Sequence, residues 1–154
     1  MDDRVTDVAA AVESAVESLV SVLDGSVAGS PTVPPAQLRV LTIVAGNRHT
    51  NMSRLAEALE VVPSSASRLC DRLEATGMLR RVPDPRDRRE VRLLLTPAAR
   101  RLLDDLRRRR RAALAQVLER MPADDRQGLV HALEAFAAVA GADRADADGD
   151  LRTA

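Results

Sequence analysis

The stretch from Pro63 to Thr96, PSSASRLCDRLEATGMLRRVPDPRDRREVRLLLT, decides the fold of this chain. It begins as a short amphipathic helix with proline at its first position and Gly77 just past its end, which are residues that start and stop helices. Two short β-type runs, residues 78–82 and 91–95, flank the turn-rich sequence PDPRDRRE. A helix that fits a DNA groove, followed by a cationic β-hairpin, is typical of a winged helix-turn-helix and predicts duplex DNA binding.

The helical part of this stretch has one apolar and one polar face. Helical spacing predicts four core positions: Ala66, Leu69, Cys70 and Leu73. The outward-facing positions are polar: Ser64, Ser65, Ser67, Arg68, Asp71 and Arg72. Small hydroxyl groups at the start of a helix, with arginines one turn later, allow close approach to phosphates and base edges.

Charge is strongly segregated along the chain, although the formal net charge is zero. Residues 35–96 hold eleven arginines against seven acidic residues, and residues 97–120 hold eight against three. The two ends, residues 1–34 and 121–154, are acidic. A concentrated positive region suits a phosphate-backbone binder, because each neutralised phosphate releases counterions. A solvated surface also carries such charge runs, so charge alone does not decide.

Apolar periodicity predicts helices on both sides of the stretch. The first, about residues 3–23, carries a heptad seam: Val5, Val8, Val12, Ala15, Leu19 and Val22. A Gly/Ser/Pro-rich linker, residues 25–35, ends it. Two helices are expected next, at about residues 35–45 and 52–59, the second with Asn51 as its N-cap.

Two further helices are expected after the hairpin, at about residues 97–120 and 123–140. The first contains the arginine run 107–111, part of which must face inward. The second is expected to bury Leu129, Val130, Leu133, Phe136 and Ala137. The tail from residue 142 lacks apolar periodicity and is expected to be disordered.

Composition excludes several classes of protein. The 154 residues include one Phe and no Tyr or Trp, so the core must be aliphatic and aromatic platforms for single-stranded nucleic acid are missing. A single Cys excludes an intrachain disulfide, and His49 and His131 lack metal-ligand spacing, so we expect no metal and no other cofactor. No GxSxG, HExxH or phosphate-binding glycine loop occurs, which predicts that the chain is not an enzyme.

The ends of the chain carry no targeting signal that we can identify. The start, MDDRVTDVAA, is acidic rather than basic, and no apolar run approaches the length of a membrane span. These observations predict a cytoplasmic protein without a membrane partner.

The order of helices and wing over about residues 3–141 resembles the MarR family of bacterial transcription regulators. The most specific part is SRLAEALEVVPSSASRLCDRLEATGMLRRVPDPRDRREVRLLLT, in which the DPRDRR wing follows the helix-turn-helix at the family's distance. The resemblance implies a mainly α fold with a small β-wing: six helices plus a two- to three-stranded hairpin, assembled as a dimer.

The resemblance also implies which residues meet DNA. The recognition helix would be residues 63–76, with DNA-facing positions Ser64, Ser65, Ser67, Arg68 and Arg72. In the wing, Asp87 and Arg89 match the family's acid-and-arginine pair, in which the acid orients an arginine that enters the minor groove. Arg86 and Arg88 are further candidates at the tip, whereas Asp84 is expected to shape the turn.

Two positions depart from the family pattern. Glu60 stands where the turn of the helix-turn-helix usually carries glycine, and Val62 stands where a serine cap is usual. A less tight turn and an uncapped recognition helix are the expected consequences.

Three residues of the stretch leave alternatives open. Arg80 and Arg81 alternate along the first strand, so one is expected to face phosphate and the other solvent. Cys70 has the spacing of a core residue, which favours an inert thiol over a redox sensor, because a reactive thiolate needs an accessible cationic environment.

Four segments are expected along the chain. They are an N-terminal dimerisation helix with its linker (1–34), a winged helix-turn-helix DNA-binding domain (35–96), C-terminal helices of the dimerisation region (97–141) and a disordered tail (142–154). The predicted function is a homodimeric, sequence-specific transcription regulator, a repressor, that binds a pseudo-palindromic operator in duplex DNA. A low-specificity architectural DNA-binding protein and a protein-interaction module remain as alternatives.

The resemblance implies in addition a small-molecule effector, bound between the dimerisation helices and the DNA-binding lobe. Phe136 is the only aromatic residue that could stack on a ring. The composition therefore predicts either an aliphatic-walled pocket with an arginine anchor or no effector at all.

Overall fold

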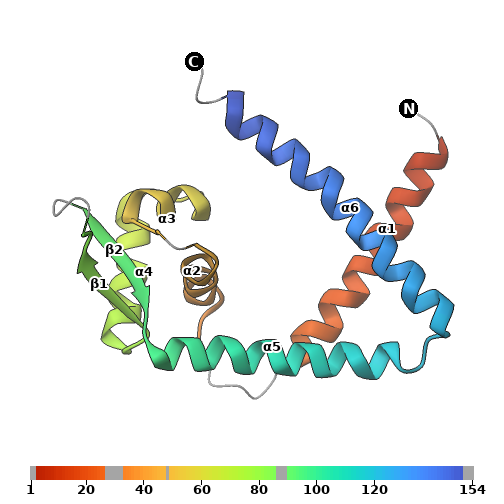
Figure 1. The fold of residues 1–154 in the computed structure, drawn as a ribbon, viewed down its shortest axis with the longest axis horizontal. Helices are drawn as coiled ribbons and strands as arrows, with labels where there is room; N and C mark the ends of the chain where they lie inside the picture. Colours follow the sequence, from red (N-terminus) through yellow and green to blue (C-terminus); the bar gives the residue numbers. More distant parts are fainter. Residues whose placement is uncertain (1–2, 27–32, 48, 86–89, 151–154) are drawn as a thin grey trace. The chain divides into compact units, whose positions relative to one another are not determined.

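The computed structural model describes residues 3–26, 33–47, 49–85 and 90–150. Its elements are α1 (Asp3–Gly25), α2 (Pro35–Gly46), α3 (Met52–Leu59), α4 (Pro63–Ala75), β1 (Leu79–Pro83), β2 (Val91–Leu95), α5 (Pro97–Leu118) and α6 (Ala123–Asp150) (Figure 1). The mainly α fold with a small β-hairpin is the one predicted from the sequence. The chain divides into two compact units, residues 1–111 and 112–154, which we describe separately.

The hairpin is a two-stranded antiparallel sheet next to α4. Its register pairs Leu79 with Leu95 and Pro83 with Val91. Beyond the strands, the amide of Asp84 donates to the carbonyl of Glu90 over 2.9 Å, which extends the pairing of the hairpin by one hydrogen bond. A single bridge between Asn51 and Arg92 adds the beginning of a third strand.

One aliphatic core holds α2, α3, α4, the hairpin and the start of α5 together. Its buried members are Val40, Leu41, Val44, Leu55, Ala56, Leu59, Ala66, Cys70, Leu73, Leu79, Leu93, Ala99 and Leu103. The inner face predicted for α4 is confirmed, with Leu69 packed at the edge of the core. The aliphatic faces of four helices and both strands meet in this core. Because the core holds one face of α4, it also determines which residues of α4 face solvent.

The turn between α3 and α4 adopts the geometry that usually calls for glycine. Glu60 has φ 56° and ψ 41°, which is the left-handed region. The amides of Glu60 and Val61 donate to the carbonyls of Glu57 and Ala56, which caps two carbonyls in the last turn of α3. Glu60 thus accepts a backbone strain of about 1–2 kcal/mol that glycine avoids. The expectation of a looser turn is wrong, because these hydrogen bonds keep the turn tight.

The other helix ends follow the sequence signals. The Asn51 side chain accepts from the amide of Arg54 over 2.9 Å, as an N-cap should. Gly77, with φ 69°, ends α4, and the amide of Met78 reaches the carbonyl of Leu73 over 2.8 Å. At the start of α5, the Thr96 hydroxyl accepts from the amide of Ala99 over 3.2 Å. These caps set where α3 and α5 begin and where α4 ends.

The apolar faces of α1 and α6 are exposed in the single chain. On α1 the seam residues Val5, Val8, Val12 and Leu19 are between 41% and 63% exposed. On α6 four of the residues expected to be buried, Leu129, Val130, Leu133 and Phe136, are 40–65% exposed in the single chain, and Val139 is 66% exposed. Amphipathic spacing identifies an apolar face, but burial also needs a partner surface.

Helix α6 is longer than expected. It continues through Ala140 to Asp150, so the prediction of a disordered tail is wrong for residues 142–150. The segment contains three alanines and no proline that would end a helix, although its four aspartates and one glycine have low helix propensity. Residues 151–154 lie outside the described part of the chain.

The arginine run on α5 is paired largely within its own helix. Arg107 contacts Asp104 at 3.2 Å, and Arg108 and Arg109 contact Asp105 at 3.0 and 2.9 Å. As expected, part of the run faces inward, since Arg110 is half-buried. The run is therefore less free to bind an outside partner than its sequence indicates.

Candidate nucleic-acid interface

Helix α4 presents a polar face on the side opposite its core contacts. Ser64, Arg68 and Arg72 are exposed, whereas Ser65 and Ser67 are half-buried. All five belong to the set predicted to face DNA. The exposed hydroxyl lies in the first turn, where the positive end of the helix dipole also favours phosphate.

The start of α4 has no side-chain cap, as the sequence predicted. Val62 occupies the N-cap position with an extended backbone, and its carbonyl accepts from the amides of Ser65 and Ala66 at 2.9 and 3.3 Å. Pro63 at the first helical position has no amide hydrogen to satisfy. Proline at the first helical position therefore leaves one fewer unpaired amide at the helix start, which partly compensates for the missing serine cap.

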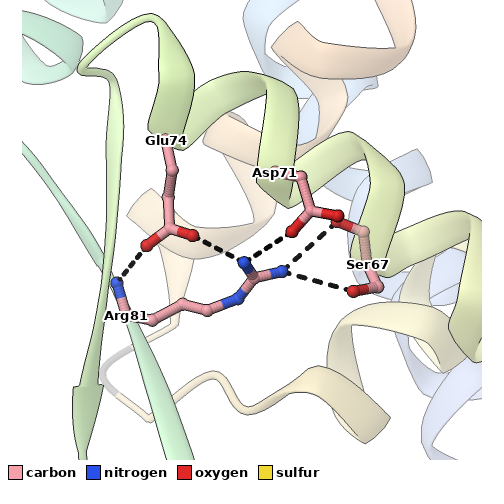
Figure 2. A network of polar contacts seen from close by, with 4 residues as sticks. All are labelled: Ser67, Asp71, Glu74 and Arg81. Carbon is pink, nitrogen blue, oxygen red and sulfur yellow. Dashed lines mark hydrogen bonds and ion pairs between the residues drawn. The ribbon is translucent and has the colours of Figure 1, made fainter.

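The side chain of Arg81 on β1 is bound to α4. Figure 2 shows its guanidinium lying between the helix residues Ser67, Asp71 and Glu74. Nη1 lies 2.6 Å from Asp71 Oδ1 and 2.5 Å from Glu74 Oε2. Nη2 donates to the carbonyl of Ser67 over 3.3 Å and to its Oγ over 3.4 Å. The backbone amide of Arg81 donates to Glu74 Oε1 over 2.9 Å.

This network corrects the expectation for the two strand arginines. Arg81 faces neither phosphate nor solvent, because its side chain is only 25% exposed and pairs with two carboxylates. Arg80 is the exposed member of the pair. The alternation of side chains along a strand predicts that Arg80 and Arg81 lie on opposite faces of β1. It does not predict which of the two faces meets the acidic residues of α4.

The tip of the wing lies outside the described residues. This applies to four of the predicted DNA-contacting positions: Arg86, Asp87, Arg88 and Arg89. At the base of the wing, Asn51 Nδ2 donates to Glu90 Oε2 over 3.1 Å. That bond ties the end of the wing to the start of α3, a connection that sequence reasoning missed because it joins residues 39 positions apart.

Cys70 and the two histidines show no features of a reactive site. Cys70 is fully buried, and burial raises the pKa of its thiol to about 11, while Arg81 lowers it and Asp71 and Glu74 raise it. A thiol of that pKa is almost entirely protonated at neutral pH, which fits the inert core assignment. His49 and His131 are both exposed.

A pocket of about 390 Å³ lies between the end of α2, strand β2 and the first turns of α5. Its lining residues are Val44, Ala45, Asn47, Arg92, Leu93, Leu94, Leu95, Arg100, Leu103, Asp104 and Arg107. The walls combine aliphatic side chains with three arginines and one aspartate, and no aromatic residue lines the pocket. This composition suits a small anion with an aliphatic body.

The described residues hold neither a metal-binding cluster nor a membrane-spanning helix. Among them, no group of three or more His, Cys, Asp or Glu side chains is arranged to hold a metal ion. Likewise, none of the helices in the described part of the chain has both the length and the apolarity needed to cross a bilayer.

Comparison with known proteins connects this surface to a family. A model of the MarR family matches residues 32–90. The HTH-type transcriptional repressor MdtR of Bacillus subtilis (strain 168) is 30% identical over 99 residues, which cover 64% of each protein. The match therefore leaves about a third of that relative's length unaligned.

Solved structures extend the likeness to nearly the whole chain. RV1404 from Mycobacterium tuberculosis aligns with a TM-score of 0.79 and 32% identity, over 92% of this chain and 97% of that one. The transcriptional repressor CouR, solved bound to a 23-mer DNA duplex, aligns with a TM-score of 0.58 and 26% identity, over 82% of this chain and 89% of CouR. With its winged helix-turn-helix core and these relatives, the chain belongs to the MarR family.

Proposed function

We propose that this protein is a sequence-specific, DNA-binding transcription regulator. The observation that carries the proposal is the solvent-facing side of α4, where Ser64, Arg68 and Arg72 are exposed opposite a fully buried core face. Hydroxyl and guanidinium groups on such a helix suit phosphates and purine edges in the major groove. In the wing, Arg89, oriented by Asp87, is proposed to enter the minor groove, with Arg86 and Arg88 as further candidates at the tip.

A homodimer is the proposed assembly. Its support is the exposed apolar surface of α1 and α6. We assign residues 1–34 and 97–141 to dimerisation and residues 35–96 to DNA binding. Two copies of α4 would then read half-sites separated by about 10 bp or a multiple of it, because that spacing returns the groove to the same face.

Repression is the proposed outcome of binding. The support is that the similar proteins MdtR and CouR are both transcriptional repressors. A protein that is bound over a promoter can repress transcription by excluding polymerase. Expression of a reporter placed behind a bound site is expected to fall when the protein is produced, and a rise would contradict the assignment.

The direct test is selection from a randomised duplex library. The wild-type protein is expected to enrich a pseudo-palindromic sequence and to bind it at least a thousandfold more tightly than a scrambled duplex, which is the usual margin for specific binders. Equal binding to all duplexes would favour an architectural protein. Binding to none at moderate salt would favour a protein-interaction module.

Arg72 allows a prediction about the contribution of phosphate contacts to DNA affinity. As a phosphate contact, it is expected to contribute equally to selected and scrambled duplexes. Arg72→Ala should therefore weaken both to the same extent and lower the salt slope of binding by about one unit. Mobility shifts at several salt concentrations measure this. If Arg72→Ala alters the preference between duplexes instead, then Arg72 reads bases.

The pocket beside β2 is the proposed site for an effector. Arg107 in its lining is paired with Asp104, so Arg100 is the proposed anchor for a carboxylate, and the aliphatic walls favour an alkyl chain over a ring. Titrated into the protein–DNA complex, octanoate is expected to release DNA at lower concentrations than salicylate, which should act only at millimolar levels. Release by low micromolar salicylate would contradict this. Arg100→Met should weaken the octanoate response.

A further inference from the structure

The contacts of Arg81 join the two DNA-binding elements of the domain to each other. Arg81 belongs to β1, the first strand of the wing, and its partners Ser67, Asp71 and Glu74 lie on α4 (Figure 2). We propose that Arg81 is a positioning residue, which fixes the recognition helix relative to the wing and thereby supports sequence discrimination. The inference rests on the proposed function, since discrimination needs α4 and the wing to meet DNA together.

The geometry requires an arginine rather than any cation. One guanidinium nitrogen serves two carboxylates, at 2.6 and 2.5 Å, while the other is directed at the Ser67 carbonyl at 3.3 Å. The three partners span two turns of α4, so the contact restrains both the rotation of α4 about its axis and its sliding along β1. A lysine ammonium is a single point charge on a flexible stem and cannot reproduce this fork.

The same contact controls charge on the recognition helix. Asp71 is 58% exposed, and an unpaired carboxylate there would repel DNA phosphates. Arg81 places a positive charge beside both Asp71 and Glu74, which lowers that repulsion. Its side chain is 25% exposed, so solvent screens the pairs less than it would on an open surface.

Arg81→Met is the main test, because methionine keeps most of the apolar stem of the side chain and removes the charged fork. The probes are the duplex that the wild-type protein selects and its scrambled version. The preference for the selected duplex is expected to fall about tenfold. The salt slope is expected to change by much less than one unit, because Arg81 itself makes no phosphate contact and the loss of its pairing with Asp71 affects both duplexes alike. Arg81→Lys is expected to lose preference to a similar extent. Arg101→Met removes an exposed arginine elsewhere and serves as the matched control, with no change in preference expected.

Three outcomes would overturn the proposal. One is an unchanged preference in Arg81→Met, and another is a full return of preference in Arg81→Lys. The third is a salt slope lowered by about one unit, which would make Arg81 a phosphate contact instead. If Arg81→Met fails to fold, Glu74→Gln provides a milder break of the same network, and the same reduction in preference is expected.

A measurement without DNA separates this inference from the proposed function. Amide hydrogen exchange in the last turns of α4 and in β1 is expected to be at least fivefold faster in Arg81→Met than in the wild type or in Arg101→Met. Unchanged exchange would refute the positioning role. If exchange increases but the wild type selects no duplex, then the positioning role stands and the proposed function fails.

Discussion

Val12→Asp is expected to convert the protein from a dimer to a monomer. Val12 lies in the middle of the α1 seam and is 44% exposed in the single chain. Two-fold symmetry would place two new carboxylates in one apolar interface, and burying an unpaired charge costs several kcal/mol. Light scattering at micromolar concentration should report about twice the 16.6 kDa chain mass for the wild type and a single chain mass for the variant.

The same change is expected to weaken DNA binding. A monomer engages one half-site, so it loses the effective concentration that links the two recognition helices, a factor of about 10²–10⁴. Ser14→Asp is the matched control, because it adds the same charge to the opposite face of α1 and should leave both mass and affinity unchanged. A Val12→Asp variant that remains dimeric would show that the α1 seam is not the interface.

Leu41→Ala is expected to lower the free energy of unfolding by about 2–5 kcal/mol. Leu41 on α2 is fully buried in the core that supports α4, so truncation removes apolar contacts and leaves a cavity. Since domains are stable by only about 5–15 kcal/mol, this is a large part of the total. Urea unfolding must be followed by far-UV circular dichroism, because the chain has no Trp or Tyr to provide fluorescence.

The neighbouring Thr42→Ala is the control for this variant. Thr42 is exposed on α2, and its hydroxyl bonds only to the Leu38 carbonyl of the same helix. Its replacement should change stability by no more than about 0.5 kcal/mol. Both variants need the same protein concentration, because dimerisation adds to apparent stability. A loss below about 1 kcal/mol in Leu41→Ala would mean that the core collapses around the missing side chain.

Local signals predicted the helix boundaries of the DNA-binding domain well. Asn51, Pro63 and Gly77 act through hydrogen bonds and backbone angles within a few residues, and the structure places each in its predicted role. The core positions of α4 were also predictable, because its apolar residues recur at helical spacing and therefore lie on one face of the helix.

Features that depend on long-range packing could not be predicted. The partners of Arg81 are set by the distance between β1 and α4, which the order of residues does not reveal. The burial expected on α6 depends on a partner surface for a related reason: its apolar spacing indicates a contact face, and the single chain leaves Phe136 and Val139 more than 60% exposed.

The burial of Cys70 makes the protein suitable for site-directed labelling. It is the only cysteine of the chain, it is fully buried, and its thiol has a pKa of about 11. A maleimide reagent at neutral pH should therefore leave it unmodified while reacting with a cysteine introduced at an exposed position such as Ser64. Spin labels or fluorophores attached there would report the separation of the two recognition helices in a dimer, with the native cysteine left in place.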